Sequence, residues 1–351
     1  MSSRLLIYCL IVFVSTTNCV DPYDFKPKEA GEYLVIDGRI TQSDDINPLK
    51  LTMSTTYATS TNARPVENAQ IKLIDSNGAF EAYIEEGDGI YMLCGNTLQV
   101  QVGGTYHLEI EIGNKKYQSI PQTLPAPVQA DSITFKVGYG SEVNEYGNEV
   151  SFENIDIFIN TPINVNGIKS YLRWKSEESW SFTEIKCHPL HNPKTCYMAR
   201  DLSTEDIYTF SSDAISGTYL SNHLVAKKRI LNNVEFIEKH FFIVSQYTLH
   251  KEAYAYWDKV IQIANPSGNI FDLPPAPLSG NVYNVNNEDE VVLGYFEVAG
   301  NSTTRIPLYQ SDIKPITITS KDYLCRWGDY VDVCCNCLNL DLSTTERPDY
   351  W

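Results

Sequence analysis

Apolar and polar residues alternate along short stretches through most of this chain. Every second residue is apolar in the stretch 105–112, and Ile155, Ile157 and Ile159 continue the same alternation in the stretch 152–160. A period of two is that of a β-strand with one buried face. The pattern therefore predicts a protein that is mostly β.

The N-terminal part of the chain is divided into short strands by turn-forming residues. Asp75-Ser76-Asn77-Gly78 and Gly113-Asn114 separate apolar stretches, as hairpin turns do. About seven strands in roughly 90 residues, with turns every 8 to 12, is the spacing of an immunoglobulin-like β-sandwich. The predicted strands cover residues 33–40, 49–57, 69–74, 79–85, 90–94, 105–112 and 116–120. We predict such a sandwich over residues 31–122, without the Cys-Trp-Cys core of true immunoglobulins.

A Pro-rich stretch, residues 121–127, follows and is typical of a semi-rigid linker. Beyond it we predict a larger β-rich domain over residues 128–351. Two further strands, 280–285 and 291–298, are predicted to pair with each other around the acidic turn Asn287–Glu290. The other predicted strands of this domain cover residues 132–137, 152–160, 170–175, 180–186, 224–231 and 234–245.

One stretch of the second domain has the periodicity of a helix. Apolar residues recur at helical spacing from Ala253 to Ala264, and Thr248 is a suitable N-cap. Asn265 and Pro266 end the pattern, because proline cannot continue a helix. The charged residues fall mostly opposite Tyr256 and Trp257, so we expect a helix over residues 249–264 that packs on a sheet as a structural lid.

The N-terminus resembles an export signal. Arg4 precedes an apolar run from Leu5 to Val14, which is too short to span a bilayer, and small polar residues then lead to Cys19. A cysteine in that place is typical of lipoprotein processing. We expect residues 1–18 to be removed, Cys19 to be acylated and residues 19–30 to form a tether. Plain secretion is the alternative, since Asn18 is an unusual residue before a lipidation site.

Charge and length narrow the possible partners. The chain has 351 residues and a formal net charge of −17, with no basic patch to offset it. Nucleic acid is therefore not expected as a partner. The composition is compatible with an extracellular or surface-exposed β protein of two domains.

Seven of the nine cysteines lie beyond the export segment. An exported compartment permits disulfides, and an odd number leaves at least one thiol free. Cys187 and Cys196 flank a short Pro-containing loop and are the preferred pair. A second bridge is expected among Cys325, Cys334, Cys335 and Cys337, whose pairing the sequence leaves open.

Several groups of side chains with chemical potential are better explained structurally. His188 and His191 beside Cys187 could hold zinc, but a disulfide-closed loop with two surface histidines is favoured. A redox role for the C-terminal cysteines would need a helix N-terminus that lowers the thiol pKa, and a structural staple is favoured instead. No metal site and no cofactor are expected.

The acidic residues give no better case for chemistry. Asp44-Asp45, Glu85-Glu86-Asp88 and Glu288–Glu290 lack the ligand spacing of a calcium loop, so solvated turns are expected. Glu177-Glu178 lies between Trp174 and Trp180, which would suggest glycoside chemistry or sugar stacking. Exposed charges on a hairpin are favoured for the two glutamates, and core positions are favoured for Trp174 and Trp257. We therefore name no catalytic residue.

A set of weak motifs, in order and over nearly the whole chain after Cys19, resembles a known family. They are Cys19–Tyr23, Leu34–Ile40, Pro65–Ile71, Gly103–Tyr106, Tyr256-Trp257, Gly280–Val282, Val292–Phe296, Cys334–Cys337 and Arg347–Trp351. The family comprises outer-membrane lipoproteins of Bacteroidota known only as a domain of unknown function. Its members are typically encoded beside TonB-dependent receptors that carry a carboxypeptidase-regulatory-like domain. The adjacent pair Cys334-Cys335 departs from the single cysteine expected there, which leaves the C-terminal pairing open.

The resemblance implies a function without assigning catalytic residues. We expect a non-enzymatic lipoprotein of the outer membrane that faces the cell surface and whose N-terminal sandwich is of the carboxypeptidase-regulatory-like type. It is expected to be an accessory or partner subunit of a TonB-dependent receptor or another outer-membrane system. The alternative is a surface protein that binds a peptide or glycan and delivers it to such a receptor. A hydrolase of unknown type is a third, weaker hypothesis.

Overall fold

The fold is described from a computed structural model. It covers residues 32–43, 47–54, 63–95, 97–165, 167–202, 206–230, 234–265, 277–314, 316, 318, 320–327 and 331–351. The predicted export segment, Cys19 with its tether, and Asp44-Asp45 lie outside these residues. Within them the protein is mostly β, with several sheets and few helices, as the alternating pattern predicts.

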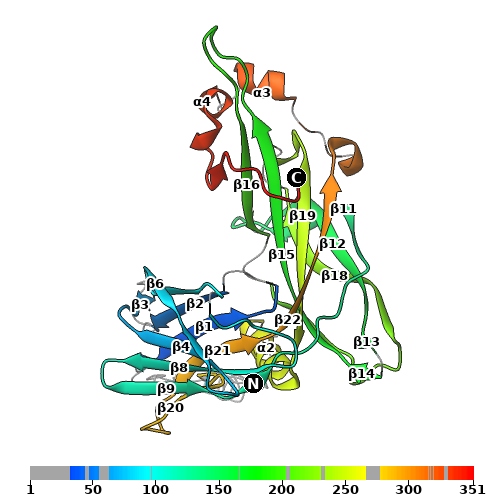
Figure 1. The fold of residues 1–351 in the computed structure, drawn as a ribbon. Helices are drawn as coiled ribbons and strands as arrows, with labels where there is room; N and C mark the ends of the chain where they lie inside the picture. The colour runs from blue at the N-terminus through cyan, green and yellow to red at the C-terminus, as the bar shows by residue number, and fades with distance from the viewer. Residues whose placement is uncertain are drawn as a thin grey trace, which may run out of the picture.

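Two sheets form the first unit of the molecule, which lies at the lower end in Figure 1. Sheet 1 has the order β21-β1-β2-β7-β6, with β3 paired to β2. Its strands are β1 (Leu34–Ile40), β2 (Asn47–Met53), β3 (Arg64–Pro65), β6 (Ile84–Gly87), β7 (Ile90–Leu93) and β21 (Val292–Val298). All described pairs in this sheet are antiparallel except β1 with β21, which is parallel.

Sheet 2 has the order β20-β9-β8-β4-β5, with β10 paired to β8. Its strands are β4 (Gln70–Asp75), β5 (Phe80–Ala82), β8 (Thr105–Ile112), β9 (Lys115–Ser119), β10 (Gln122–Thr123) and β20 (Val282–Asn284). The alternation along each strand turns one side of each sheet inward. Leu108 of β8 and Leu49 of β2, both fully buried, belong to one hydrophobic core shared by the two sheets.

The first unit is completed by strands from late in the chain. The sequence pattern predicts that residues 280–285 and 291–298 pair with each other, and this is wrong. Instead β20 pairs with β9 in sheet 2, and β21 lies parallel to β1 in sheet 1. Gly294 permits this approach, because a Cβ atom there would lie 2.0 Å from the Ile36 carbonyl oxygen.

The second unit contains one large sheet and one smaller sheet. Sheet 3 has the order β22-β19-β15-β16-β23, with β17 paired to β15, and sheet 4 has the order β11-β12-β18. The strands of sheet 3 are β15 (Tyr171–Thr183), β16 (Thr195–Asp201), β17 (Tyr208–Ser211), β19 (His240–Leu249), β22 (Gly300–Leu308) and β23 (Ser343–Thr344). Those of sheet 4 are β11 (Ser132–Val143), β12 (Glu149–Pro162) and β18 (Tyr219–Arg229), and β13 (Asn164–Val165) pairs with β14 (Ile168–Lys169).

The strands of the second unit are longer than the sequence predicts. Residues 170–175 and 180–186 were expected as two strands, but one strand, β15, runs through Tyr171–Thr183. The expected loop 138–148 is mostly strand, since β11 and β12 remain paired as far as Val143 and Glu149. Phe242 and Ile157, from sheets 3 and 4, lie in the same buried core.

One helix, α2 (Lys251–Ala264), lies within two residues of its predicted start and ends where predicted. Its N-cap is His250 rather than the expected Thr248, which still belongs to β19 and accepts a hydrogen bond from the Val128 N–H at 2.8 Å. The buried Ala253 packs with Tyr247 of β19 and Tyr295 of β21. The helix therefore covers the junction of the two units rather than one sheet alone.

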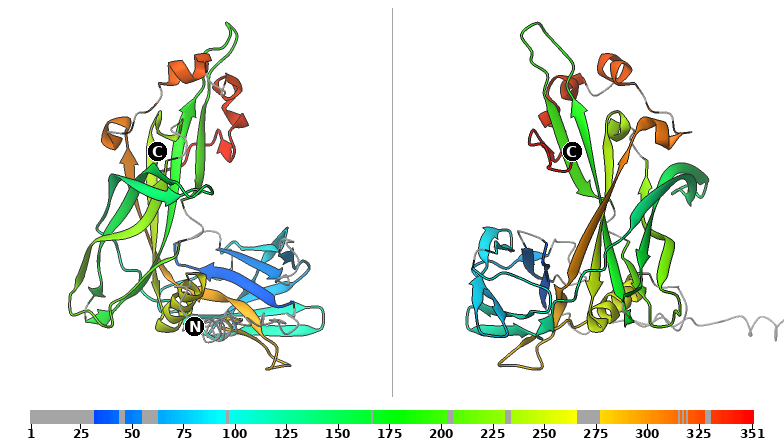
Figure 2. Two further views of the ribbon diagram at one scale, coloured as in Figure 1. Left: turned by 180° about the vertical axis from the view of Figure 1, so that it is seen from behind. Right: turned by 45° about the vertical axis from the view of Figure 1, so that its right-hand side comes forward.

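The C-terminal residues cap the opposite end of the second unit (Figure 2). They form α3 (Lys321–Trp327), α4 (Val331–Cys335) and two short 3-10 helices, η2 (Gln310–Ile313) and η3 (Cys337–Asn339); a third, η1 (Val234–Phe236), precedes β19. No helix in the described ranges is long and apolar enough to cross a bilayer.

Three disulfides hold this end together, and they confirm the predicted staple. The bonds join Cys187 to Cys335, Cys196 to Cys337 and Cys325 to Cys334. The preferred pair Cys187–Cys196 is therefore wrong: both partners reach across to the C-terminal helices instead. Cys94 is the free cysteine among the described residues.

Two of these bonds close nearly the same loop, with sequence separations of 148 and 141 residues. By loop entropy, loss of either pair, as Cys187→Ala/Cys335→Ala or Cys196→Ala/Cys337→Ala, should cost about 3 kcal/mol, because the other bond still closes the long loop. Loss of both pairs should cost about 8 kcal/mol, more than the sum of the single losses. Denaturant unfolding measures these free energies, and strictly additive costs would contradict the redundancy.

Candidate functional site

A cleft of about 510 Å³ lies where the two units meet. Strands β1, β2 and β7 of the first unit form one side, and β15, β17, β18 and α2 of the second unit form the other. Ligand sites occur preferentially at such junctions between packed units. The polar and aromatic residues that line the cleft include Arg39, Lys50, Arg173, Lys175, Tyr208 and Trp257.

A buried carboxylate fixes two arginines at the cleft. Glu297 of β21 is 2 % exposed and accepts hydrogen bonds from Arg173, at 2.7 Å to Nη2 and 3.3 Å to Nε. Arg39 of β1 lies 3.8 Å from the same carboxylate. Since Arg173 belongs to β15, this acid joins the two units by charge.

Aromatic rings fix the same arginines from the side. The Arg39 guanidinium lies 3.8 Å from the centroid of the Tyr247 ring, and that of Arg173 lies 4.5 Å from the Trp257 ring. Trp257 in turn donates its indole N–H to Glu297 at 2.8 Å. Cation–π contacts and charge-assisted hydrogen bonds therefore hold this wall of the cleft in one geometry.

The charge on Glu297 is maintained by its partners. Burial alone would raise the pKa of this carboxyl, but the positive charges of Arg173 and Arg39 and the hydrogen bonds from Arg173 and Trp257 outweigh it. The pKa of Glu297 is lowered below its usual 4.5 as a result. The acid is ionised at neutral pH and balances one of the two arginine charges.

The remaining polar groups give the cleft both signs of charge. Lys175 lies 2.9 Å from Asp201 and 3.0 Å from Glu177; burial lowers its pKa, but these acids raise it further, so the net shift is upward. Lys50 is exposed at the opposite side. Burial and the neighbouring Asp206 raise the pKa of Tyr208 to about 12, so this phenol stays neutral. Such a cleft can form hydrogen bonds with a polar ligand of low net charge.

A second buried charge cluster lies inside the second unit and was not foreseen. Glu178 is fully buried, and its carboxylate lies 2.6 Å from Arg200 Nε, 2.7 Å from Lys228 Nζ and 3.3 Å from His240 Nε2. Glu235 forms ion pairs with the same lysine, at 2.6 Å, and with Arg200. Burial raises the pKa of Glu178, but the hydrogen bond from His240 and the charge of Lys228 lower it below its usual value.

This cluster corrects the interpretation of Glu177-Glu178 as exposed charges on a hairpin. Along β15 the even-numbered residues from Leu172 to Phe182 face inward, so Glu178 lies on the buried side. The period-two pattern contains this signal, but division of the stretch into two strands concealed it. Trp174 is buried, as expected, whereas Trp257, the other tryptophan expected in the core, is half-buried at the cleft. Trp174 and Trp180 are 3 % and 7 % exposed, so neither offers a face for sugar stacking.

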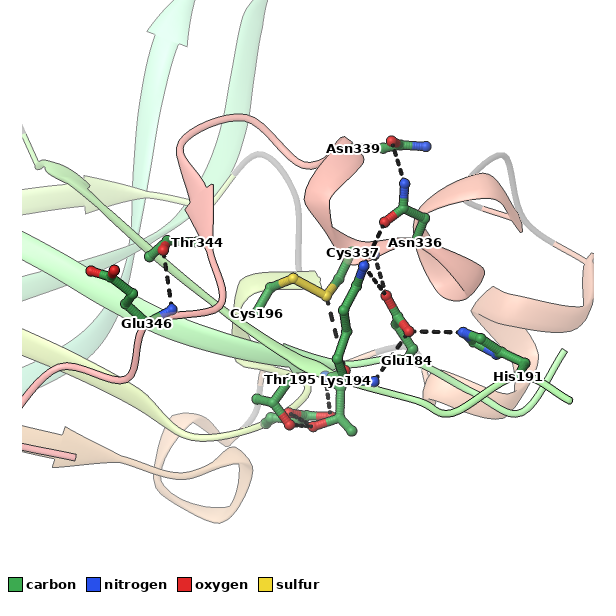
Figure 3. The surroundings of a disulfide bond; sticks show 12 residues. Glu184, His191, Lys194, Thr195, Cys196, Asn336, Cys337, Asn339, Thr344 and Glu346 are labelled. Atoms are coloured by element: carbon green, nitrogen blue, oxygen red, sulfur yellow. Dashed lines mark hydrogen bonds and ion pairs between the residues drawn. A yellow bond between two sulfur atoms is a disulfide. The ribbon is translucent and has the colours of Figure 1, made fainter.

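The disulfide-stapled end contains another buried acid, Glu184 (Figure 3). Its carboxylate accepts hydrogen bonds from the backbone N–H groups of Cys337 at 3.0 Å and Lys194 at 3.1 Å. His191 Nε2 lies 2.9 Å from the same carboxylate. The histidine is thus part of the packing around Cys196–Cys337, in keeping with the structural interpretation of this loop.

No group of three or more His, Cys, Asp or Glu side chains in the described ranges has the arrangement of a metal site. In the acidic turn that follows β20, for example, the protein itself occupies the carboxylate oxygens. Glu290 is engaged by Lys115 at 2.9 Å, Tyr117 at 2.9 Å and Asn284 at 2.7 Å, all of them hydrogen-bond donors from the protein.

These features define a mostly β protein of two packed units with a cleft between them and a disulfide-stapled end. A sequence model of the family described as Domain of unknown function (DUF4249) matches residues 20–305, and the chain belongs to this family. No curated protein matches the chain.

One solved structure similar to the chain is titled "Biofilm associated protein - BSP domain". The sequences are 9 % identical, the match covers 84 % of this chain and 62 % of the other, and the TM-score is 0.16. This chain therefore spans less than two thirds of that structure, and so low a score carries no argument about fold or function.

We predict that Glu297→Gln destabilises the protein by about 3 kcal/mol at pH 7, because it leaves the mostly buried Arg173 and the partly buried Arg39 without their counter-charge. The loss should shrink on acidification. Since the folded-state pKa of Glu297 is below the usual 4.5, its contribution is complete above that pH and is lost as the pH falls through the folded value. Denaturant unfolding from pH 7 to pH 3 measures this.

The exposed Glu346→Gln is the matched control, and it should leave the free energy of unfolding unchanged within about 0.5 kcal/mol. A constant difference between wild type and Glu297→Gln at all pH values would contradict the proposed role of the charge.

Proposed function

We propose that this protein is a non-enzymatic, lipid-anchored lipoprotein of a Bacteroidota outer membrane. It would act as an accessory or partner subunit of a TonB-dependent receptor or another outer-membrane system. The N-terminal pattern supports export and anchoring, since the apolar run Leu5–Val14 leads to Cys19. The family match begins at residue 20, so the predicted export segment lies outside the matched region.

The three disulfides support export as well. Such bonds form and persist in oxidising compartments outside the cytosol. Two of them join β15–β16 residues to the C-terminal helices over more than a hundred residues of sequence, so they stabilise the whole second unit. The two-sheet core of the first unit is compatible with the immunoglobulin-like sandwich of the proposed family architecture.

The observation that carries a partner role is an exposed hairpin. The first residues of β12, Glu149–Glu153, precede the part of the strand that pairs with β18. The outer part of the β11–β12 hairpin therefore projects as a two-stranded ribbon (Figure 2). Its exposed apolar side chains are Tyr139 at 66 %, Val143 at 71 %, Tyr146 at 79 % and Val150 at 40 %. Exposed aromatic and aliphatic residues grouped in this way are typical of a protein interface.

Charge indicates the kind of partner that would bind there. Glu142, Glu145 and Glu149 lie among the exposed apolar residues of the hairpin. A partner surface that combines an apolar groove with lysines or arginines would complement it. We propose that this hairpin, referred to below as the acidic hairpin, contacts the receptor.

We predict that the protein co-purifies with a TonB-dependent receptor from detergent-solubilised outer membranes. The double variant Val143→Ser/Tyr146→Ser should reduce the amount of receptor recovered at least tenfold, because the loss of two apolar contacts costs about 1.4 kcal/mol or more of binding free energy. Phe80→Ser/Ile84→Ser, at exposed positions of the first unit, is the matched control. Recovery of the wild-type protein always alone would refute the receptor role.

The cleft favours a second candidate function, a surface protein that binds a peptide or glycan and delivers it to such a receptor. Fixed arginines, a lysine and half-buried aromatic residues could bind either class of polar ligand. This function is compatible with the first, because a delivery protein must also dock on its receptor.

We predict that Lys50→Ala weakens binding of such a ligand about tenfold, through loss of one charge-assisted hydrogen bond. Calorimetric titration with short peptides and oligosaccharides measures the affinity. Lys136→Ala, on β11 outside the cleft, should have no effect. Equal affinity of both variants and the wild type would exclude this side of the cleft as the binding site.

A further inference from the structure

Four exposed apolar side chains lie together at the lower end of the second unit. They are Val165 at 40 %, Ile168 at 71 %, Ile215 at 38 % and Tyr219 at 44 % exposure, and we name them the basal patch. Val165 and Ile168 are opposite each other in the β13–β14 pair. Ile215 and Tyr219 come from the connection between β17 and β18 and the first residue of β18.

Hydrogen bonds hold the two segments side by side. The Ile163 N–H donates to the Thr218 carbonyl at 2.9 Å, and Pro162 pairs with Tyr219 in the β12–β18 register. Lys169 Nζ donates to the carbonyls of Ser212 at 2.9 Å and Ile215 at 2.8 Å. The apolar side chains are thus presented together by a fixed backbone.

Charge distinguishes the basal patch from the acidic hairpin. Residues 162–170 contain one charged side chain, Lys169, and residues 212–220 contain one, Asp213. Lys169 is bonded to the backbone, while Asp213 accepts from Tyr171 at 2.9 Å and pairs with Lys251 at 3.3 Å. Asp131 also lies beside the patch, where it is hydrogen-bonded to the Tyr219 phenol. With Lys251 counted as well, the two positive and two negative groups around the patch cancel, on a chain whose formal charge is −17.

We propose that the basal patch inserts into the headgroup region of a neutral, zwitterionic phospholipid surface. Branched aliphatic side chains gain by leaving water, and a tyrosine is well suited to the interface between headgroups and acyl chains. The acidic hairpin cannot do the same, because each inserted carboxylate is costly in that environment. Anionic lipid is disfavoured by the charge of the chain, and a second copy of the chain would be repelled in the same way.

The anchor proposed above sets which end of the molecule can reach a membrane, and the present proposal rests on it. Between Cys19 and Tyr33 the chain can extend at most about 50 Å. The first unit, which Leu34 enters, and the β13–β14 pair lie at the same end of the molecule in every view (Figures 1 and 2). The disulfide-stapled end lies farther away by the length of β15, about 40 Å. The end with the β13–β14 pair therefore reaches the membrane whatever the extension of the tether, whereas the stapled end reaches it only when the tether is almost fully extended.

The test uses the lipidated chain reconstituted into phosphatidylcholine vesicles with and without brominated acyl chains, which quench tryptophan on contact. Ile168→Trp adds a reporter within the basal patch, at a side chain exposed enough that its replacement leaves the core intact. Leu190→Trp is the matched control, at a position 93 % exposed near the disulfide-stapled end. We expect brominated lipid to remove most of the emission added at position 168 and none of that added at position 190.

Two further measurements make the outcomes distinct. Co-sedimentation of the lipidated protein with vesicles, compared with Cys19→Ala, tests the anchor alone, and equal sedimentation of the two would overturn the proposed anchoring. If the lipidated protein sediments but position 168 is not quenched, the basal patch does not insert and this inference is overturned. Quenching that requires phosphatidylglycerol in the vesicles would overturn it as well.

Hydrogen exchange tests the same inference without a substitution in the basal patch. Amides of residues 163–170 and 212–219 should exchange more slowly on neutral vesicles than in detergent-free solution of the Cys19→Ala protein. Protection confined to other segments would count against the patch, and a protein partner would then be its remaining occupant.

Discussion

The arrangement of the two units depends on one buried carboxylate. Glu297 lies on the last strand of sheet 1, yet its strongest partner, Arg173, belongs to the central region of sheet 3. Such a pair is stabilising only when both charges are matched and hydrogen-bonded, and Trp257, Tyr247 and Arg39 meet that condition together. This contact joins β21, β15 and α2 at the wall of the cleft that Arg39, Arg173 and Trp257 line.

The chain path reinforces the same junction. β21 of the first unit is followed almost at once by β22 of the second, with only Ala299 between them, and this residue is buried in the cluster beneath α2. The two units therefore share a covalent crossing, a helix and an ion pair at one place. This explains why β20 and β21, which are far from the N-terminus in sequence, belong to the two sheets of the first unit.

The sequence predicts what depends on local pattern. Period-two alternation identifies most strands of the first unit, and helical spacing identifies α2 within two residues. The pattern does not specify partners that are far apart in sequence. Loop spacing favours a disulfide between Cys187 and the nearest cysteine, Cys196, whereas the disulfide partner of Cys187 is 148 residues away. The polarity of Glu178 predicts an exposed side chain. Its burial is possible because Lys228, Arg200 and His240, which belong to other strands, lie beside its carboxylate.

The parallel pairing of β1 with β21 has a consequence for biogenesis. A chain is synthesised from its N-terminus, so β1 is available long before Val292–Val298 has been made. During that interval β1 is an unprotected sheet edge, which is a template for wrong pairing and aggregation. Maturation of both units therefore waits for nearly the whole polypeptide, and a chaperone that shields this edge would have its greatest effect in that window.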